Sequence, residues 1–156
     1  MPRETPVSTV MTRQVAVLRP DMDVPEAARL LEEHSIGGAP VVDETGRFIG
    51  MLEDEDLIAT EANLHVPTVI NLLGVDFSLP WDNVRFKEEF RKAVSTTVGQ
   101  LMKEDFPSVA ADDTVEDVAT LMRDEDVNRV VVLDDNSMVI GVVTRSDLVR
   151  ALARES

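Results

Sequence analysis

The apolar and polar positions of this 156-residue chain follow the same order twice. Residues 7–59 align with residues 98–150 without a gap, at an offset of 91 positions that places Gly50 on Gly141. Repetition at a fixed offset indicates that one structural unit has been duplicated. A repeat of about fifty residues is near the lower limit for burying a core of its own, so we expect the two repeats to form one compact module.

Within each repeat the pattern predicts the element order β-α-β-β-α. In the first repeat a β-type run at 15–18 leads through a proline turn to Asp23, which we expect to cap a helix with Glu26 completing a capping box. The second repeat has Thr114 and Asp117 at the matching helix start. The buried faces of these two helices are expected to consist of Val24, Ala27, Ala28 and Leu31, and of Val115, Val118, Ala119 and Met122.

A glycine pair, Gly37 and Gly38, is expected to end the first helix. The nearly continuous apolar runs that follow are typical of strands covered on both faces. A closing helix after Glu53 or Thr144 completes each repeat. The strands are predicted, as pairs joined by tight turns, at 40–42 and 47–52 and again at 130–133 and 138–143.

The segment 60–97 between the repeats is too apolar for a disordered linker and too long for a bare loop. Helical spacing predicts a short helix ending at Gly74 and a longer amphipathic helix starting near Asp82. We expect the aromatic side chains between them, Phe77 and Trp81, to pack on the module's own core or at a dimer interface, with a ligand cage as the alternative. Because this insertion adds apolar surface, we expect a homodimer.

Composition excludes several classes of function. The net charge is −15, with 15 Lys and Arg against 30 Asp and Glu, which argues against binding duplex nucleic acid. The absence of cysteine excludes disulfides and thiolate zinc sites. No apolar run reaches the roughly twenty residues of a membrane span, and the N-terminus has no signal-peptide pattern. We expect a cytoplasmic protein that does not enter a membrane.

The stretch from Gly141 to Asp147 is predicted to be a strand that runs directly into a helix. Glycine at this junction would let a ligand approach the backbone, and the free amides of the first helical turn would favour an anion. Thr144 and Asp147 are three positions apart, so both side chains can face one point. A carboxylate there could accept hydrogen bonds from two ribose hydroxyls, but the same pair is also typical of a capped helix start.

The element order, the duplication and the run Gly141-Val142-Val143-Thr144-Arg145-Ser146-Asp147 resemble the CBS-domain family, named after a domain of cystathionine β-synthase. The resemblance covers 7–59 and 98–150. It implies an α/β (α+β) fold, in which tandem repeats form a pseudo-two-fold pair with their sheets packed together and two clefts between them. Such clefts often hold adenosine-containing ligands.

This resemblance implies sensing rather than catalysis, and the chain has no cysteine nucleophile and no Walker loop. We expect a stand-alone regulatory module that binds AMP, ADP, ATP or S-adenosylmethionine, with Mg²⁺ possible beside ATP, and that acts on a protein partner or within an oligomer. One alternative is a ligand-free interaction or dimerisation scaffold. A more distant one is a carboxylate-metal hydrolase built on residues 53–56.

Site residues follow from the resemblance. It assigns ribose contact to Thr144 and Asp147 in the second repeat. Arg129 stands where many relatives hold a phosphate, although a surface ion pair with a nearby carboxylate is the alternative. Arg145 is a second candidate for a phosphate, or else a solvated helix residue.

The backbone at Ser108 and Val109 corresponds to the place where the family reads the adenine edge.

The first repeat departs from this pattern. Asp56 is retained, but Glu53 replaces the motif threonine and Gly38 stands in the place of the arginine. The four carboxylates at 53–56 are typical of a solvated helix N-terminus, with a divalent cation as the alternative. Because like charges repel at short range, we expect this repeat to reject metal-free ATP and the chain to bind one nucleotide.

Overall fold

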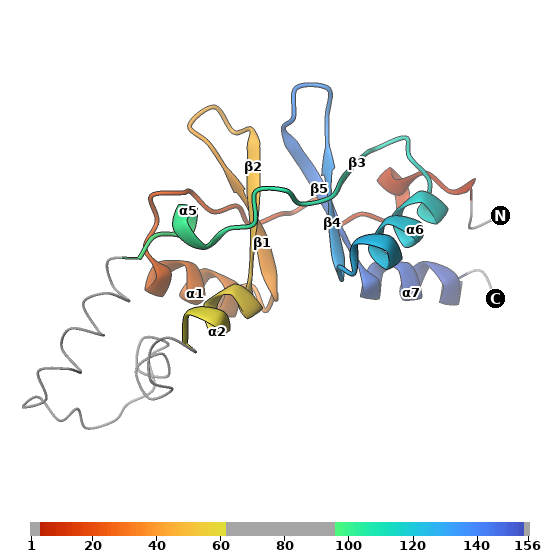
Figure 1. The fold of residues 1–156 in the computed structure, drawn as a ribbon. Coiled ribbons are helices and arrows are strands. Elements are labelled where there is room, and N and C mark those ends of the chain that lie inside the picture. Colours follow the sequence, from red (N-terminus) through yellow and green to blue (C-terminus); the bar gives the residue numbers. More distant parts are fainter. Residues whose placement is uncertain (1–3, 62–95, 155–156) are drawn as a thin grey trace, which may run out of the picture. The chain divides into compact units, whose positions relative to one another are not determined.

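The computed structural model describes residues 4–61 and 96–154. It has a mixed α/β fold with one two-stranded and one three-stranded sheet (Figure 1). The helices predicted before Gly74 and after Asp82 lie outside the described residues. In chain order the elements are a 3-10 helix at Val7–Thr9, α1 (Val24–Glu33), β1 (Gly38–Val42), β2 (Phe48–Glu53), α2 (Asp54–Glu61), α5 (Val98–Leu101), β3 (Ser108–Ala110), α6 (Val115–Glu125), β4 (Arg129–Leu133), β5 (Val139–Thr144) and α7 (Arg145–Arg154).

The described residues divide into two compact units. Each unit combines the first segment of one repeat with most of the other repeat. Unit 1 contains residues 4–15, 43–49 and 105–154. Unit 2 contains the rest, namely 16–42, 50–61 and 96–104. The segment that opens the first repeat therefore packs with the body of the second repeat, and the segment that opens the second repeat packs with the body of the first.

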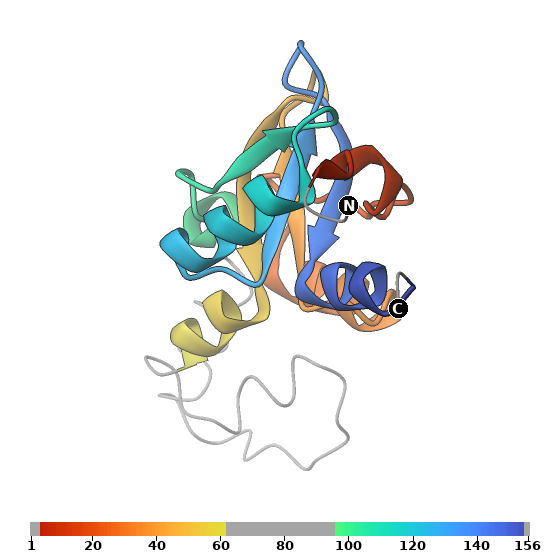
Figure 2. The same cartoon turned by 90° about the vertical axis from the view of Figure 1, so that its right-hand side faces the viewer.

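In unit 1, β4 lies between β3, to which it is parallel, and β5, to which it is antiparallel. Both α6 and α7 cover the same face of this sheet (Figures 1 and 2). The core between sheet and helices is apolar, and the N-terminal segment contributes to it. Its buried members are Val7, Met11, Val109, Val118, Met122, Val130, Val132 and Val143.

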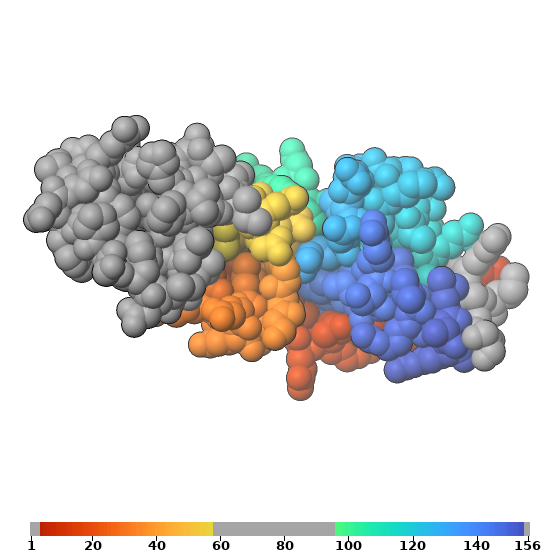
Figure 3. Space-filling view, turned by 90° about the horizontal axis from the view of Figure 1, so that it is seen from below, coloured from red at the N-terminus to blue at the C-terminus, as the bar shows by residue number. Residues whose placement is uncertain are grey.

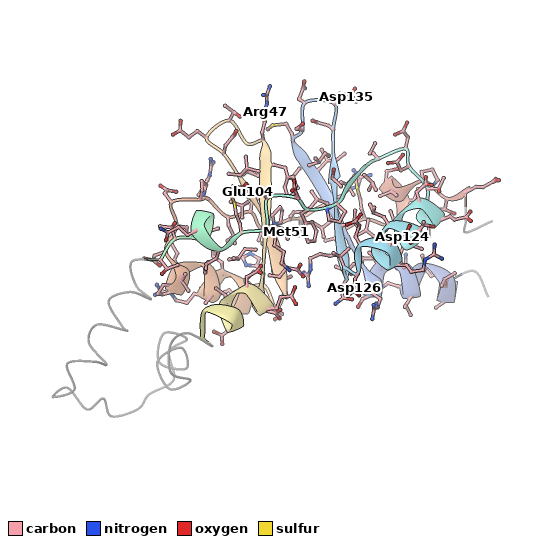
Figure 4. All side chains as sticks on the ribbon, in the orientation of Figure 1. Arg47, Met51, Glu104, Asp124, Asp126 and Asp135 are labelled. Atoms are coloured by element: carbon pink, nitrogen blue, oxygen red, sulfur yellow. The ribbon has the colours of Figure 1, made fainter. Side chains whose placement is uncertain are left out.

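The turn between β1 and β2 also belongs to unit 1. The backbone amide of Phe48 donates to the carbonyl of Ser137 at 2.9 Å, and Arg47 pairs with Met138 in an antiparallel bridge. Figure 4 shows Arg47 and Asp135 at this end of the structure. Contact between the two hairpin turns thus links a short piece of the first repeat to the second.

Unit 2 contains α1, α2, α5 and most of the β1–β2 sheet. All four residues predicted for the buried face of α1 are buried, which confirms that prediction. The predicted N-cap is confirmed as well, since the Asp23 carboxylate accepts a hydrogen bond from the Glu26 amide at 2.8 Å. The matching capping box of Thr114 and Asp117 at the start of α6 is complete in both directions.

Two details of the predicted helices are wrong. Ala119 is exposed, because the buried face of α6 consists of Val115, Val118 and Met122 alone. The first helix ends at Glu33, before the glycine pair, and the left-handed turn after it is made by Ser35 at φ 53°. Gly38 instead begins β1, so the glycine pair does not end the helix.

The strand predicted at 15–18 is reduced to one parallel bridge between Leu18 and Val41. Its counterpart β3 makes three such pairs with β4. The difference has a local cause in β1. Pro40 has no N–H, whereas Val131 at the matching position donates to Pro107 at 3.4 Å. The first repeat therefore lacks its opening strand.

Candidate functional site

The candidate site lies where β5 runs into α7. The Thr144 amide donates to Oδ2 of Asp147 at 2.9 Å, and the Asp147 amide donates to the Thr144 hydroxyl at 3.3 Å. These reciprocal hydrogen bonds make a capping box, which satisfies two donors at the helix start. The capped-helix interpretation of this pair therefore holds, and it leaves the second carboxylate oxygen of Asp147 for other contacts.

Asp147 is one of two buried charged residues among the described part of the chain, with 6% of its surface exposed. Thr12 lies beside it, because the backbone of Thr12 pairs with Val142 at the edge of β5. The Thr12 hydroxyl lies 3.5 Å from Oδ1 and 3.4 Å from Oδ2 of Asp147. Arg150, one turn along α7, approaches Oδ1 at 3.2 Å. The carboxylate thus joins α7, β5 and the N-terminal segment.

A cavity of about 370 Å³ opens beside Asp147. This volume is within the range of about 300–1,000 Å³ that small-molecule sites show. Figure 3 shows α7 (dark blue) at the surface next to the N-terminal segment (red), and the walls come from these two parts and α6. The lining residues are Thr5, Thr9, Val10, Met11, Thr12, Val115, Asp147, Arg150, Ala151 and Arg154.

This lining combines apolar walls with several hydrogen-bonding groups. One wall holds the threonines Thr5, Thr9 and Thr12, and the other holds Arg150 and Arg154 on α7. The arginines are four positions apart, so they lie one above the other on the helix surface. Two guanidinium groups beside one carboxylate can bind a ligand that has both hydroxyl donors and a phosphate.

The role predicted for Gly141 is wrong. Gly141 is buried, and a Cβ atom there would stand 2.5 Å from Sδ and 2.9 Å from Cγ of Met11. The glycine is therefore required by the close approach of Met11, not by a ligand. Gly50 shows the same relationship in unit 2, where a Cβ atom would stand 2.8 Å from Sδ of Met102.

The other predicted site residues are placed as follows. Arg129 begins β4 and is paired across the ladder with Thr144, so these two are brought together. Arg145 is the exposed first residue of α7. Ser108 and Val109 lie on β3, on the far side of β4 from β5. Their roles stay predictions.

Of the ten residues that line the cavity, only Asp147 was predicted as a site residue from the sequence. Thr12 reaches Asp147 across 135 positions of the chain, and no local pattern marks such a contact. Arg150 and Arg154 could have been found, because the spacing from Asp147 puts both near its side of the same helix.

The matching helix start in unit 2 is that of α2. It has the same kind of cap, but Lys103 lies beside it. The Glu53 amide donates to Oδ2 of Asp56 at 2.8 Å. Lys103 lies among the carboxylates, with Nζ at 3.4 Å from Glu53 and 3.7 Å from Asp56 and in contact with Glu55. Burial lowers the pKa of Lys103, but the hydrogen bond to Glu55 and the negative charges of Asp56 and Glu53 raise it by more, so the net shift is upward.

Two features of the described residues bear on other functions. No group of three or more His, Asp and Glu side chains there is arranged to hold a metal ion. In the same part of the chain, every helix is too short or too polar to cross a bilayer.

Several known proteins are similar in sequence to most of this chain. The protein MJ1426 of Methanocaldococcus jannaschii is 29% identical over 94% of this chain and 90% of its own length. The CBS domain-containing protein YhcV of Bacillus subtilis is 30% identical over 96% of this chain and 88% of its own length. The chloroplastic CBSX1 of Arabidopsis thaliana is 30% identical over 93% of this chain, which spans 63% of that protein.

Solved structures share the fold. CBSX2 in complex with AMP is 26% identical, with a TM-score of 0.74 over 97% of this chain and 98% of that one. The CBS domain pair of MJ0100, in complex with 5′-methylthioadenosine and S-adenosylmethionine, is 22% identical with a TM-score of 0.74 over 97% of this chain and 98% of that one. The CBS domain model matches residues 7–63 and 98–154. The duplicated chain is therefore a member of the CBS-domain family and carries a tandem pair of these domains.

Proposed function

We propose that this chain is a regulatory module that binds an adenosine-containing ligand in the cavity of unit 1. The observation that carries the proposal is the buried carboxylate of Asp147 at the edge of a cavity that also holds two arginines. The complexes of CBSX2 with AMP and of MJ0100 with S-adenosylmethionine and 5′-methylthioadenosine support the ligand class. Ligand binding, rather than chemistry on the ligand, is the function we assign.

The carboxylate of Asp147 would accept hydrogen bonds from the two ribose hydroxyls. Its Oδ2 is held by the capping bond from Thr144, so the orientation of the group is set before any ligand arrives. The contacts with the Thr12 hydroxyl are 3.4 and 3.5 Å, which is long for O–H···O, so ribose hydroxyls could replace them at small cost. Preorganisation of this kind reduces the entropy that binding loses.

The charge of the cavity favours a ligand with phosphate. Arg150 and Arg154 place two positive charges against the one carboxylate of Asp147. We therefore expect AMP, ADP and ATP to bind more tightly than the sulfonium ligand S-adenosylmethionine. Guanidinium groups also pair with phosphate through two hydrogen bonds at once, which adds to the electrostatic attraction.

Calorimetric titration of Asp147→Asn with AMP tests the proposal. Removing the charge while keeping the shape should cost about 1.5–3 kcal/mol of binding, the range for hydrogen bonds to charged groups. The matched control is Asp117→Asn, which changes the equivalent capping aspartate of α6 and lies outside the cavity. Equal affinities for the wild type and Asp147→Asn, or no binding of any adenosine ligand, would favour the alternative of a ligand-free scaffold.

A further inference from the structure

The cavity of unit 1 has two chemically different walls. On one wall α7 supplies the charged groups, which are Asp147, Arg150 and Arg154. The N-terminal segment forms the other wall, and its side chains there are uncharged. They are Thr5, Thr9, Val10, Met11 and Thr12. The proposed function places the ribose and the phosphate of a nucleotide on α7, so the flat, uncharged base is left to pack against the N-terminal segment.

The hydroxyl of Thr9 has a fixed hydrogen-bond polarity. Its Oγ1 donates to the carbonyl oxygen of Pro6 at 2.7 Å, and a carbonyl oxygen can only accept. A threonine hydroxyl has one hydrogen to donate and two lone pairs. Because its hydrogen is used inside the segment, Thr9 offers only lone pairs to a ligand. Thr9 is exposed, so a ligand reaches this oxygen without a rearrangement of the segment.

The proline at position 6 explains this polarity. In the second repeat Gln100 stands where Thr9 stands, and its side-chain oxygen accepts a hydrogen bond from the Thr97 amide at 2.9 Å. Pro6 stands where Thr97 stands and has no N–H. The Thr9 side chain therefore cannot accept from the backbone there, and it donates to the Pro6 carbonyl instead.

An acceptor on this wall distinguishes purines by the substituent at position 6 of the ring. Adenine has an amino group there, which donates, whereas hypoxanthine has an oxygen, which accepts. To donate to that oxygen, Thr9 would have to give up its bond to Pro6. The loss of one such neutral hydrogen bond corresponds to about a factor of ten in affinity. The N1–H donor of hypoxanthine is at the next ring position, so it would meet Thr9 only if the base shifted.

We propose that Thr9 determines the base specificity of the cavity by accepting a hydrogen bond from the 6-amino group of adenine. The inference rests on the proposed function, because it takes ribose contact by Asp147 as given. AMP, 5′-methylthioadenosine and S-adenosylmethionine, the ligands in the complexes of CBSX2 and MJ0100, all contain this amino group. Ser108 and Val109, which were expected to read the adenine edge, do not line the cavity, so a base in the cavity needs another partner.

Calorimetric titration with three nucleoside 5′-monophosphates tests the inference. At position 6 of the ring, AMP carries an amino group, purine riboside 5′-monophosphate carries hydrogen, and inosine 5′-monophosphate (IMP) carries oxygen. The wild type should bind AMP about tenfold more tightly than IMP, with the purine riboside between them. Thr9→Val removes the acceptor at nearly the same shape, so the three affinities should become nearly equal.

Two further variants are the controls. Thr9→Ser keeps the hydroxyl and should keep the preference for AMP. Thr45→Val removes another exposed hydroxyl that donates within its own turn, to Asp43 at 2.6 Å, but Thr45 does not line the cavity. This variant should leave all three affinities unchanged. Because the Thr9 amide still donates to Pro6 at 3.0 Å, Thr9→Val should keep the thermal unfolding midpoint of the wild type within a few degrees.

The wild type alone can overturn the inference, since equal affinities for AMP and IMP would show that the cavity does not read position 6. A preference for AMP that persisted in Thr9→Val would also overturn it, because another group would then read the base. In both cases, AMP binding that weakens in Asp147→Asn would leave the proposed function standing. If the wild type bound none of the three nucleotides, the proposed function and the inference would fail together.

Discussion

Met11 lies against the α-carbon of Gly141, so that a Cβ atom on Gly141 would stand 2.5 Å from the Met11 Sδ. The contact joins the N-terminal segment to the middle of β5. Both residues are buried, and Met11 also lines the cavity. Packing against Met11 thus explains the glycine at the start of the motif that runs from Gly141 to Asp147. Substitutions that test this explanation should change the stability of the protein.

Gly141→Ala should destabilise unit 1. Added volume in a packed core costs about 1–3 kcal/mol, since Met11 has to move. Urea unfolding gives the free energy, and Gly50→Ala should show a similar loss through Met102. In a Met11→Ala background, Gly141→Ala should lower the free energy of unfolding by less than it does in the wild type. An unchanged midpoint for Gly141→Ala would contradict this account.

Arg150→Gln and Arg154→Gln should weaken AMP binding by about 1.5–3 kcal/mol each if both contact the phosphate. The affinity for 5′-methylthioadenosine, which has no phosphate, should change far less. Calorimetry with the two ligands separates a phosphate contact from a general disturbance of α7. Arg123→Gln on the exposed side of α6 serves as the control, because Arg123 does not line the cavity. Equal losses for both ligands would exclude a phosphate contact.

The stability of the protein should depend on Lys103 at alkaline pH. Its pKa is raised in the folded state above the ordinary value of 10.5, so the folded state binds this proton more tightly than the unfolded state does. Its contribution is then present in full below the unfolded pKa and is lost as pH rises through the folded pKa. Thermal unfolding from pH 8 to pH 11.5 should show a steeper alkaline loss for the wild type than for Lys103→Met. Parallel curves would argue against the upward shift.

Homodimer formation stays a prediction. On α7, Val149 is 61% and Leu152 57% exposed, three positions apart on one side of the helix. Exposed apolar side chains at this spacing are typical of a helix that packs against a partner. Light scattering should give twice the monomer mass of 17.2 kDa, and Val149→Lys with Leu152→Lys should return the monomer. A monomer mass for the wild type at micromolar concentration would refute the prediction.

Local features of the sequence were enough to predict most of the elements. The helical spacing of Val24, Ala27 and Leu31 identified the buried face of α1, and Thr114 with Asp117 identified the start of α6. Successive residues in such features lie within four positions of each other. Their geometry follows from the helix itself, so the rest of the chain is not needed to predict them.

Two predictions from the sequence were wrong because a residue distant in the chain decided the outcome. Pro40 removes one hydrogen bond from β1, so the run at 15–18 forms only a bridge at Leu18. Gly141 was interpreted as leaving room for a ligand, but Met11 fills that space.

The sequence by itself determined the duplication, the family and the pair of residues at the start of α7. Only the tertiary structure decided what surrounds that pair, because the repeats exchange their first segments between the two units. Thr12 thereby reaches Asp147, and Lys103 reaches Glu53, across 135 and 50 positions. These contacts depend on pairing between strand edges far apart in the chain, and no periodicity in the sequence records that pairing.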